Sequence, residues 1–505
     1  MELKEKLSLH PFLFGIFPII FIFAINIQEI RFIEIVPLVA VILVITFILL
    51  IFTSIIFKNK KSGSFVISIG IILFFSYGHL YSLVESNVEL RHIFLVGVFA
   101  GLFILSIYYF SKTKRDLKNA TKILNAIAVT LIAISLFNIV SENIQGNYNL
   151  DFVNFNQENG YKDTTFSIGD KPDVYYIILD AYAGAEILDE YFGFKNQEFV
   201  SFLEEKGFYV VKNSQANYPT TTLSLSSSLN MEHIECKNNS QSCKNVGPYY
   251  ESIQNNKVMK KFNSEGYKIV NFYSGAYPTT YFKDASNLCG KFSNIINSEL
   301  TITVLGKSLL YPIYVKLFED ERREMILCVF SELENVQHNY DKPIFVLAHL
   351  IIPHHPYIFG PNGESVSPEK LEIGWEGLEN DKEGYLNQVK FVNKKIKQVV
   401  TNIIDESEIS PIIIIQGDHG LKTKIEDYNN PSDKVLRERF SILNAYHLPN
   451  QNESVYQNIT PVNSFRIVIN ELFNEENELL SDSSYWLNSG PPSNLKEVTS
   501  ILSEE

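Results

Sequence analysis

The sequence predicts a chain of two parts, five transmembrane helices followed by an α/β domain whose central sheet is mostly parallel and flanked by helices. Three observations support this fold class. Residues 1–140 are dominated by Ile, Leu, Phe and Val, whereas residues 141–505 have the mixed composition of an ordinary soluble domain. Apolar runs in the second part alternate with helical patterns, as they do in doubly wound α/β domains. One run, residues 411–420, contains four consecutive isoleucines, which suit a strand buried on both faces.

Five apolar segments in the first part are close to the length that spans a bilayer. They are residues 11–27, 35–57, 65–84, 93–110 and 123–140. Five such runs in succession favour membrane spans over buried helices of a soluble domain, and no small-residue cleavage site marks the first as a signal peptide. We therefore expect three parts: a five-span domain that is integral in the membrane (1–140), a polar linker (141–171) and an extracytoplasmic α/β domain (172–505).

Basic residues are concentrated in two of the four loops between these segments. The loops after spans two and four carry Lys58, Lys60, Lys61, Lys112, Lys114, Arg115, Lys118 and Lys122. The other two loops carry only Arg31 and Arg91, each beside acidic residues. By the positive-inside rule, the amino terminus is predicted to lie in the cytoplasm and the domain after span five outside the cytoplasmic membrane.

The net charge also differs between the two parts of the chain. Residues 1–140 contain 12 Lys and Arg and 7 Asp and Glu, a net charge of +5, which leaves −19 of the chain's total of −14 for the remainder. Because nucleic-acid binding proteins carry basic surfaces, the acidic second part argues against a nucleic-acid partner.

All four cysteines fall in the second part, which agrees with an oxidising compartment outside the cytoplasm. Cys236 and Cys243 flank a short polar loop and are predicted to form a local disulfide, which leaves Cys289 and Cys328 as the other pair. Zinc binding by cysteine is a poor alternative, because the chain has no close Cys-x-x-Cys pair.

The α/β domain is predicted to open with Asp173-Val-Tyr-Tyr-Ile-Ile-Leu-Asp180, an apolar strand that ends in a carboxylate. A helix is expected over residues 185–206, where apolar residues recur at helical spacing. Further strands are expected over residues 208–211, 267–272, 343–348 and 412–415, and a helix over residues 385–404.

The isoleucine-rich strand is followed by Gly417-Asp418-His419-Gly420. In open α/β sheets ligands bind just beyond the carboxyl ends of the strands, so Asp418 and His419 can place an oxygen and a nitrogen on one metal ion. The alternative is a surface turn, since Asp and Gly are common in turns. Metal binding requires partners from elsewhere in the chain, and Asp180 is the first candidate.

A hydroxyl-rich run, Asn217-Tyr-Pro-Thr-Thr-Thr-Leu-Ser-Leu-Ser-Ser-Ser-Leu-Asn230, is predicted to begin a helix with a threonine cap. Such a helix end offers unpaired N–H groups and the positive end of the helix dipole to a phosphoryl or sulfuryl group. A threonine hydroxyl becomes a useful nucleophile when a metal lowers its pKa. Capping alone is the simpler explanation of these residues.

Three histidines follow the strand predicted at 343–348, in Ala348-His-Leu-Ile-Ile-Pro-His-His-Pro-Tyr357. They could hydrogen-bond a transferred phosphoryl group or protonate a leaving oxygen. The alternative is structural, with His349 ending the strand and the prolines shaping a loop. The prolines are expected to expose His354 and His355, so that at least one of them faces the cleft.

Together these features resemble the alkaline phosphatase and sulfatase superfamily over roughly residues 172–450. Five spans before such a domain also resemble lipoteichoic acid synthases and lipid phosphoethanolamine transferases. The resemblance implies an alkaline phosphatase-like fold and a metal site with Asp180, Asp418 and His419 as ligands.

The same resemblance assigns a nucleophile and a contact to the transferred group. Thr221 matches the nucleophile, itself a metal ligand, because it stands three residues after Tyr218 and three before Ser224. His354, two residues before Pro356, matches the histidine that contacts the transferred group. His349 and His355 are candidates for a further site, and Thr220 and Thr222 are alternative nucleophiles if the register is shifted.

The chain departs from these families at several positions. Asp180 stands where the lipid-linked transferases usually have Glu, and Ala181 stands where sulfatases usually have a second Asp. The Cys/Ser-x-Pro-x-Arg motif that sulfatases need to make formylglycine is absent, and His419 replaces their usual Asn. A nitrogen ligand favours zinc or manganese over the calcium of sulfatases. These differences argue against hydrolysis of sulfate esters.

We therefore expect a metal-dependent transferase that moves a phospho-group from a lipid-type donor to a glycan or lipid acceptor through a phospho-threonine intermediate. Its substrates would be membrane lipids or envelope glycans, reached from the outer side of the membrane. Two alternatives stay open. One is a hydrolase on the same site, either a phosphodiesterase or phosphatase or, less favoured, a sulfuric ester hydrolase. The other is a surface protein without catalytic activity.

Overall fold

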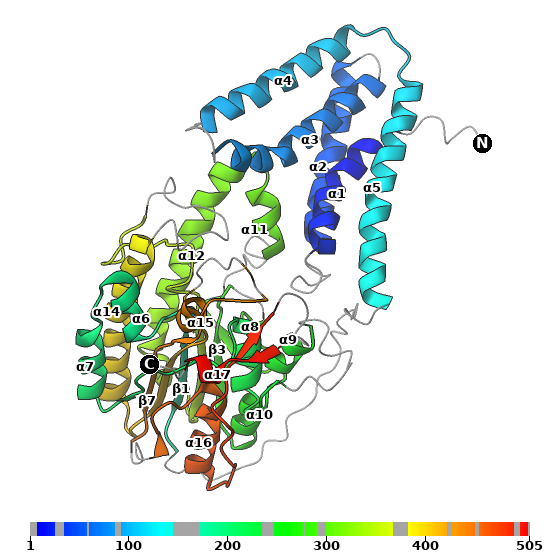
Figure 1. Cartoon of the computed structure of the whole chain (residues 1–505). Helices are drawn as coiled ribbons and strands as arrows, with labels where there is room; N and C mark the ends of the chain where they lie inside the picture. Colours follow the sequence, from blue (N-terminus) through cyan, green and yellow to red (C-terminus); the bar gives the residue numbers. More distant parts are fainter. Residues whose placement is uncertain are drawn as a thin grey trace. The chain divides into compact units, whose positions relative to one another are not determined.

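The computed structural model describes residues 8–25, 35–57, 60–85, 92–144, 171–234, 247–275, 278–290, 299–366, 382–421, 427, 429–449, 454–488 and 495–502 (Figure 1). The chain divides into two compact units, Met1–Gln157 with Phe292–Phe318, and Glu158–Lys291 with Glu319–Glu505. The predicted boundaries at 140 and 172 stay a prediction. Of the residues expected in the second domain, residues 299–318 belong by their contacts to the same unit as the N-terminal helices.

The first unit is built from long apolar helices. They are α1 (His10–Ile25), α2 (Ile35–Ile56), α3 (Lys60–Glu85), α4 (His92–Lys112), α5 (Lys118–Ile144) and the shorter α11 (Glu299–Gly306). Helices α2 to α5 are each long and apolar enough to cross a membrane, whereas α1 has 16 residues. Leu300 and Val304 of α11 pack against Ile19 and Phe23 of α1. The predicted five apolar segments therefore all form helices.

The second unit contains a seven-stranded sheet in the order β2-β7-β6-β1-β5-β3-β4. Its strands are β1 (Val174–Leu179), β2 (Tyr209–Val210), β3 (Lys268–Phe272), β4 (Ser286–Leu288), β5 (Ile344–Leu350), β6 (Ile412–Gly417) and β7 (Asn444–His447). The five strands from β6 to β4 are parallel, and β7 pairs antiparallel with both β6 and β2. A separate hairpin joins β8 (Tyr485–Leu487) to β9 (Leu495–Glu497). The predicted fold class, apolar helices followed by a mostly parallel α/β sheet, is confirmed.

Helices pack on both faces of this sheet because its central strands are apolar on both sides. On one face, alternate residues of the strands, such as Tyr176, Phe345 and Ile414, pack with Phe262 and Phe465 in one core cluster. The helices of this face include α8 (Thr221–Ser228), α10 (Lys257–Ser264) and α16 (Pro461–Phe473). Helices α7 (Gln197–Glu205) and α14 (Lys382–Glu406) lie on the other side in Figure 1. The remaining elements of the unit are α6 (Ala185–Phe192), α9 (Gly247–Gln254), η5 (Val336–Asn339), α15 (Asp433–Phe440), α17 (Thr499–Leu502) and the part of α12 (Tyr311–Leu333) from Glu319 onward.

Two predicted elements differ from the structure. The single helix expected over residues 185–206 is two helices, α6 and α7, because Gly193 adopts a left-handed conformation (φ 65°) that ends α6. The strand expected over residues 343–348 extends to Leu350, so His349 lies within β5 and not in the loop beyond it.

The structure joins Cys289 and Cys328 in a disulfide. Cys236 and Cys243, the other predicted pair, lie outside the described residues.

Candidate metal centre

The candidate site lies beyond the carboxyl ends of β1 and β6. In the parallel register of these neighbouring strands, Leu179 is opposite Gly417, so the next residues, Asp180 and Asp418, leave the sheet side by side. Neighbouring strands are about 4.8 Å apart, which is close enough for two carboxylates to share one cation. The buried apolar strands therefore determine which carboxylates meet.

Both glycines of the Gly-Asp-His-Gly sequence are required by close backbone packing. A Cβ atom on Gly417 would lie 2.6 Å from the carbonyl oxygen of Tyr182, and one on Gly420 would overlap the carbonyl oxygen of Glu438. Any larger residue would push these segments apart and displace the two side chains between them.

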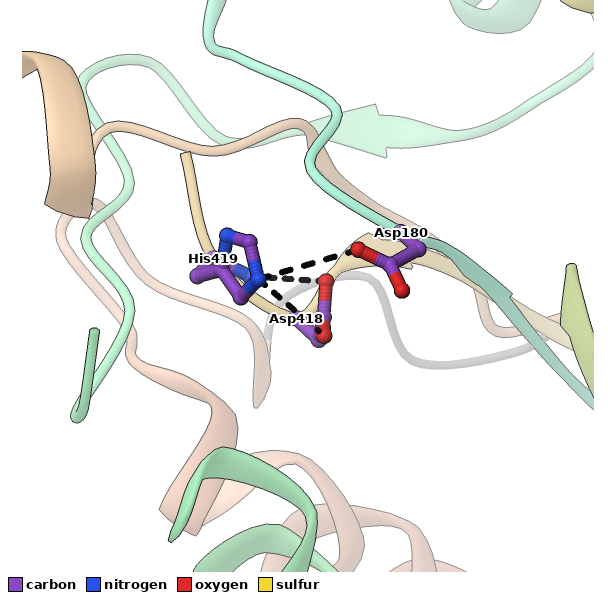
Figure 2. A group of neighbouring side chains, drawn as sticks. All are labelled: Asp180, Asp418 and His419. Carbon is purple, nitrogen blue, oxygen red and sulfur yellow. Dashed lines mark hydrogen bonds and ion pairs between the residues drawn. The ribbon is translucent and has the colours of Figure 1, made fainter. Parts of the chain in front are cut away.

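Three buried side chains converge at this edge of the sheet (Figure 2). His419 Nε2 lies 3.7 Å from Asp180 Oδ1 and 3.8 Å from Asp418 Oδ2. All three residues are at most 5% exposed. The convergence predicted for Asp180, Asp418 and His419 is present, and the spacing is near the distance between neighbouring ligands of one tetrahedral zinc ion.

The hydrogen bonds around these side chains turn acceptor atoms toward one another. Asp418 Oδ1 accepts the N–H groups of Ala181 (3.1 Å) and His419 (2.9 Å), which leaves Oδ2 facing the centre. His419 Nδ1 lies 2.8 Å from the carbonyl oxygen of Gly420, to which it donates, so the lone pair of Nε2 also faces the centre.

Two buried carboxylate oxygens at this centre, Asp180 Oδ1 and Asp418 Oδ2, make no hydrogen bond with any residue that the structure describes. Burying such an oxygen without a partner is costly, and here two of them face a nitrogen lone pair. A divalent cation would satisfy all three atoms, so the residues fit a metal ion. Two oxygens and one nitrogen are a donor set that zinc and manganese accept.

Neighbouring imidazoles stabilise the charge of Asp180. Burial alone would raise the pKa of this carboxyl group, but the nearby imidazole of His354, together with those of His349 and His419, outweighs burial and holds its pKa below its ordinary value. Asp180 is therefore ionised at neutral pH, the state in which a carboxylate binds a metal.

His349 contacts the candidate centre from inside the sheet. Its Nε2 lies 3.6 Å from Asp180 Oδ2, and its Nδ1 lies 2.6 Å from the hydroxyl of Thr279. The side chain is buried, and its Nε2 makes no hydrogen bond within the described part of the chain. His349 is thus adjacent to the cluster, which it reaches from β5. Its membership of a further site stays a prediction.

His354 lies near the cluster on the loop that follows β5. Its backbone N–H donates to the carbonyl oxygen of Asp180 (3.1 Å), and the centre of its ring is 6.4 Å from that of His419. The ring of His355 packs edge-on against that of Tyr357, with 5.4 Å between ring centres. Both histidines are half-buried. Of the two, the structure brings His354 to the site.

Thr221 is the first residue of α8 and is half-buried. The preceding Thr220 has the extended backbone of an N-cap, but its side chain makes no capping hydrogen bond, so the predicted threonine cap is wrong in that respect. Two backbone hydrogen bonds connect the segment before α8 with the Gly-Asp-His-Gly sequence through the end of α15. The N–H of Ala216 donates to the carbonyl oxygen of Phe440, and the N–H of Gly420 donates to the carbonyl oxygen of the adjacent Arg439. The role of Thr221 as nucleophile and metal ligand stays a prediction.

Two residues near the site belong to no sequence motif that predicts a functional role. Thr279 supports His349 from a loop with no recognisable motif. Gln388 of α14 contacts the loop that carries His354. The only sign of Gln388 in the sequence is a polar residue within the apolar stripe formed by Tyr385, Val389 and Val392.

No protein-family model matches the chain, and no curated protein matches its sequence. Among solved structures, the chain is similar to the integral membrane protein lipooligosaccharide phosphoethanolamine transferase A (EptA) from Neisseria meningitidis. The identity is 12% and the TM-score 0.38, over 92% of this chain and 93% of that one.

The structural neighbours also include soluble domains of both groups that the sequence resembles. The C-terminal periplasmic domain of EptC from Escherichia coli, in complex with zinc, is 12% identical with a TM-score of 0.38, over 66% of this chain and 94% of that one. A putative sulfatase from Bacteroides thetaiotaomicron is 11% identical with a TM-score of 0.38, over 61% of this chain and 72% of that one.

Proposed function

We propose that this protein is a membrane-bound, metal-dependent transferase of phospho-groups. The observation that carries the proposal is the buried cluster of Asp180, Asp418 and His419, in which two carboxylate oxygens and one imidazole nitrogen face a common centre. A buried arrangement of this kind is destabilising without a cation, so it points to a metal-binding function.

In this proposal Thr221 is the nucleophile. Its Oγ1, after losing its proton to solvent, would form a bond to the phosphorus of a phosphodiester donor while the bond from phosphorus to the leaving oxygen breaks, which gives a phospho-threonine. A hydroxyl group of the acceptor would then attack the same phosphorus, lose its proton to solvent and release the threonine oxygen. His354 would contact the transferred group and protonate the leaving oxygen.

The ion would be held by Asp180, Asp418 and His419, with Thr221 as the fourth ligand, and zinc or manganese is the proposed metal. When bound, it would lower the pKa of the threonine hydroxyl and offset negative charge on the phosphoryl oxygens. The N–H groups at the start of α8 would donate to the same oxygens.

The apolar helices of the first unit support a lipid-type donor. Four of them are long and apolar enough to cross a membrane, whereas an enzyme acting on a soluble substrate needs only one anchor. The distribution of Lys and Arg supports an amino terminus in the cytoplasm, which would place the second unit outside the cytoplasmic membrane beside lipids and envelope glycans.

Comparing the lipids and surface glycans of cells with and without the gene tests the function. We expect the gene to add a phospho-group of one defined mass to a glycan or lipid, and the His419→Ala variant to lack this product. Release of free phospho-product without a modified acceptor would instead indicate a hydrolase. Identical lipids and glycans in all strains, together with metal-free purified protein, would indicate a surface protein without catalytic activity.

A further inference from the structure

One buried side chain closes the loop that carries His354. Gln388 of α14 is fully buried, and its Nε2 donates to the carbonyl oxygens of Pro353 (3.1 Å) and His354 (3.2 Å). Its Oε1 accepts the N–H groups of Ile358 (2.9 Å) and Phe359 (3.3 Å). A single amide therefore joins the two arms of the loop.

Among side chains of this length, an uncharged primary amide is needed for these contacts. It supplies two donors to one arm and an acceptor to the other, which uses its whole hydrogen-bonding capacity. An ionised carboxylate could not donate to Pro353 and His354, and an apolar side chain would leave buried backbone groups of the loop without this partner. The donors and acceptor of the Gln388 amide are therefore those that the two arms of the closed loop require.

The closed loop exposes only the segment between its two arms. Residues 351–353 and 357–360 are buried, whereas His354, His355 and Pro356 are half-buried. His354 is also bound to its own loop, because its Nδ1 lies 2.6 Å from the carbonyl oxygen of His355. The position of the His354 ring beside His419 therefore follows from the conformation of this loop.

We propose that Gln388 is a positioning residue that holds His354 where it contacts the transferred group. This inference rests on the proposed function of the site. Gln388 itself touches the loop backbone and acts on the reaction through His354. Other hydrogen bonds hold the arms separately: the His354 N–H donates to the carbonyl oxygen of Asp180, and Arg323 donates to that of Ile358. Loss of the Gln388 amide would remove the bonds that join the two arms to one side chain and shift His354, while leaving Asp180, Asp418 and His419 in place.

The test compares Gln388→Met in two backgrounds, using full-length protein purified in detergent and loaded with zinc. The probe is bis(4-nitrophenyl) phosphate, a chromogenic phosphodiester. We expect Gln388→Met to lower kcat at least about tenfold in the otherwise unchanged protein, and less than about twofold in a His354→Ala background, because residues that act as a unit are not additive. Metal content is expected to stay within about twofold of the unchanged protein.

Hydrogen–deuterium exchange gives a readout that does not depend on activity. We expect the peptide containing Ile358 and Phe359 to exchange at least about tenfold faster in Gln388→Met, because the Phe359 amide loses its acceptor and the Ile358 amide keeps only the carbonyl oxygen of Pro356 (3.1 Å). The matched control is Asn402→Leu on the same helix. Its amide contacts Glu334 and not this loop, so it should change neither the rate nor the exchange.

Three outcomes would overturn the inference: an equal loss of kcat in both backgrounds, an unchanged kcat, or unchanged exchange in Gln388→Met. Failure of the proposed function is separate and is seen in the unchanged protein. If that protein neither turns over the diester nor forms an adduct on Thr221, the proposed function is wrong and Gln388 has no role in transfer. Faster exchange in Gln388→Met would then show only that Gln388 closes the loop.

Discussion

Asp418→Asn is expected to lower the affinity for the metal by more than about 100-fold and to abolish activity. Loss of a partner that only orients a ligand already costs 10–100-fold, and Asp418 is proposed as a direct ligand. Its Oδ1 is occupied by the N–H groups of Ala181 and His419, so the asparagine oxygen would take that place. The amide NH₂ would then point at the cation in place of Oδ2.

The measurement is the metal content of full-length protein after dialysis against a defined concentration of zinc or manganese. Asp405→Asn is a matched control, since Asp405 is a surface carboxylate that pairs with Lys206, and it should leave the metal content unchanged. Equal metal content in Asp418→Asn and in the unchanged protein would show that Asp418 is no ligand.

Thr221→Ala is expected to remove the covalent intermediate and to lower the transfer rate at least about 10³-fold. The substitution deletes the oxygen that attacks phosphorus, and loss of a nucleophile is among the most severe changes that an active site can undergo. Mass spectrometry of donor-treated protein should show a phospho-group on residue 221 in the unchanged protein and no adduct in the variant. Metal content should fall less than in Asp418→Asn, because both carboxylates and the imidazole are retained.

The neighbouring threonines provide the controls for this assignment. Thr220→Ala and Thr222→Ala have the same chemistry one position away, and both variants should retain the adduct on Thr221. The side chain of Thr220 makes no capping hydrogen bond, so its loss should cost α8 little. An adduct that persists in Thr221→Ala, on Thr220 or on Thr222, would move the nucleophile to that residue.

The parts of the site that lie at strand ends were predictable from the sequence. Runs such as Val174–Leu179 and Ile412–Ile415 are apolar without interruption, so they indicate central parallel strands. The residues that follow such strands meet at one edge of the sheet. Asp180, Asp418 and His419 were found in this way. Gly417 and Gly420 strengthened the motif, and the structure explains them by close backbone contacts.

Contacts made away from the strand ends were not predictable. His349 had been expected in a loop, but β5 continues for two more residues and places it against Asp180. Thr279 contacts His349 from 70 residues away, and Gln388 contacts His354 from 34 residues away. No pattern in the segments of Thr279 and Gln388 predicts these contacts. Such pairs depend on how the helices and loops pack on the sheet, which periodicity along the chain does not report.

The most direct test of the proposed metal centre is anomalous X-ray scattering from crystals of the full-length protein, measured at the zinc and manganese absorption edges. We predict one strong peak about 2 Å from Asp180 Oδ1, Asp418 Oδ2, His419 Nε2 and Thr221 Oγ1. A peak elsewhere, or no peak in metal-loaded crystals with these side chains hydrogen-bonded to one another, would contradict it.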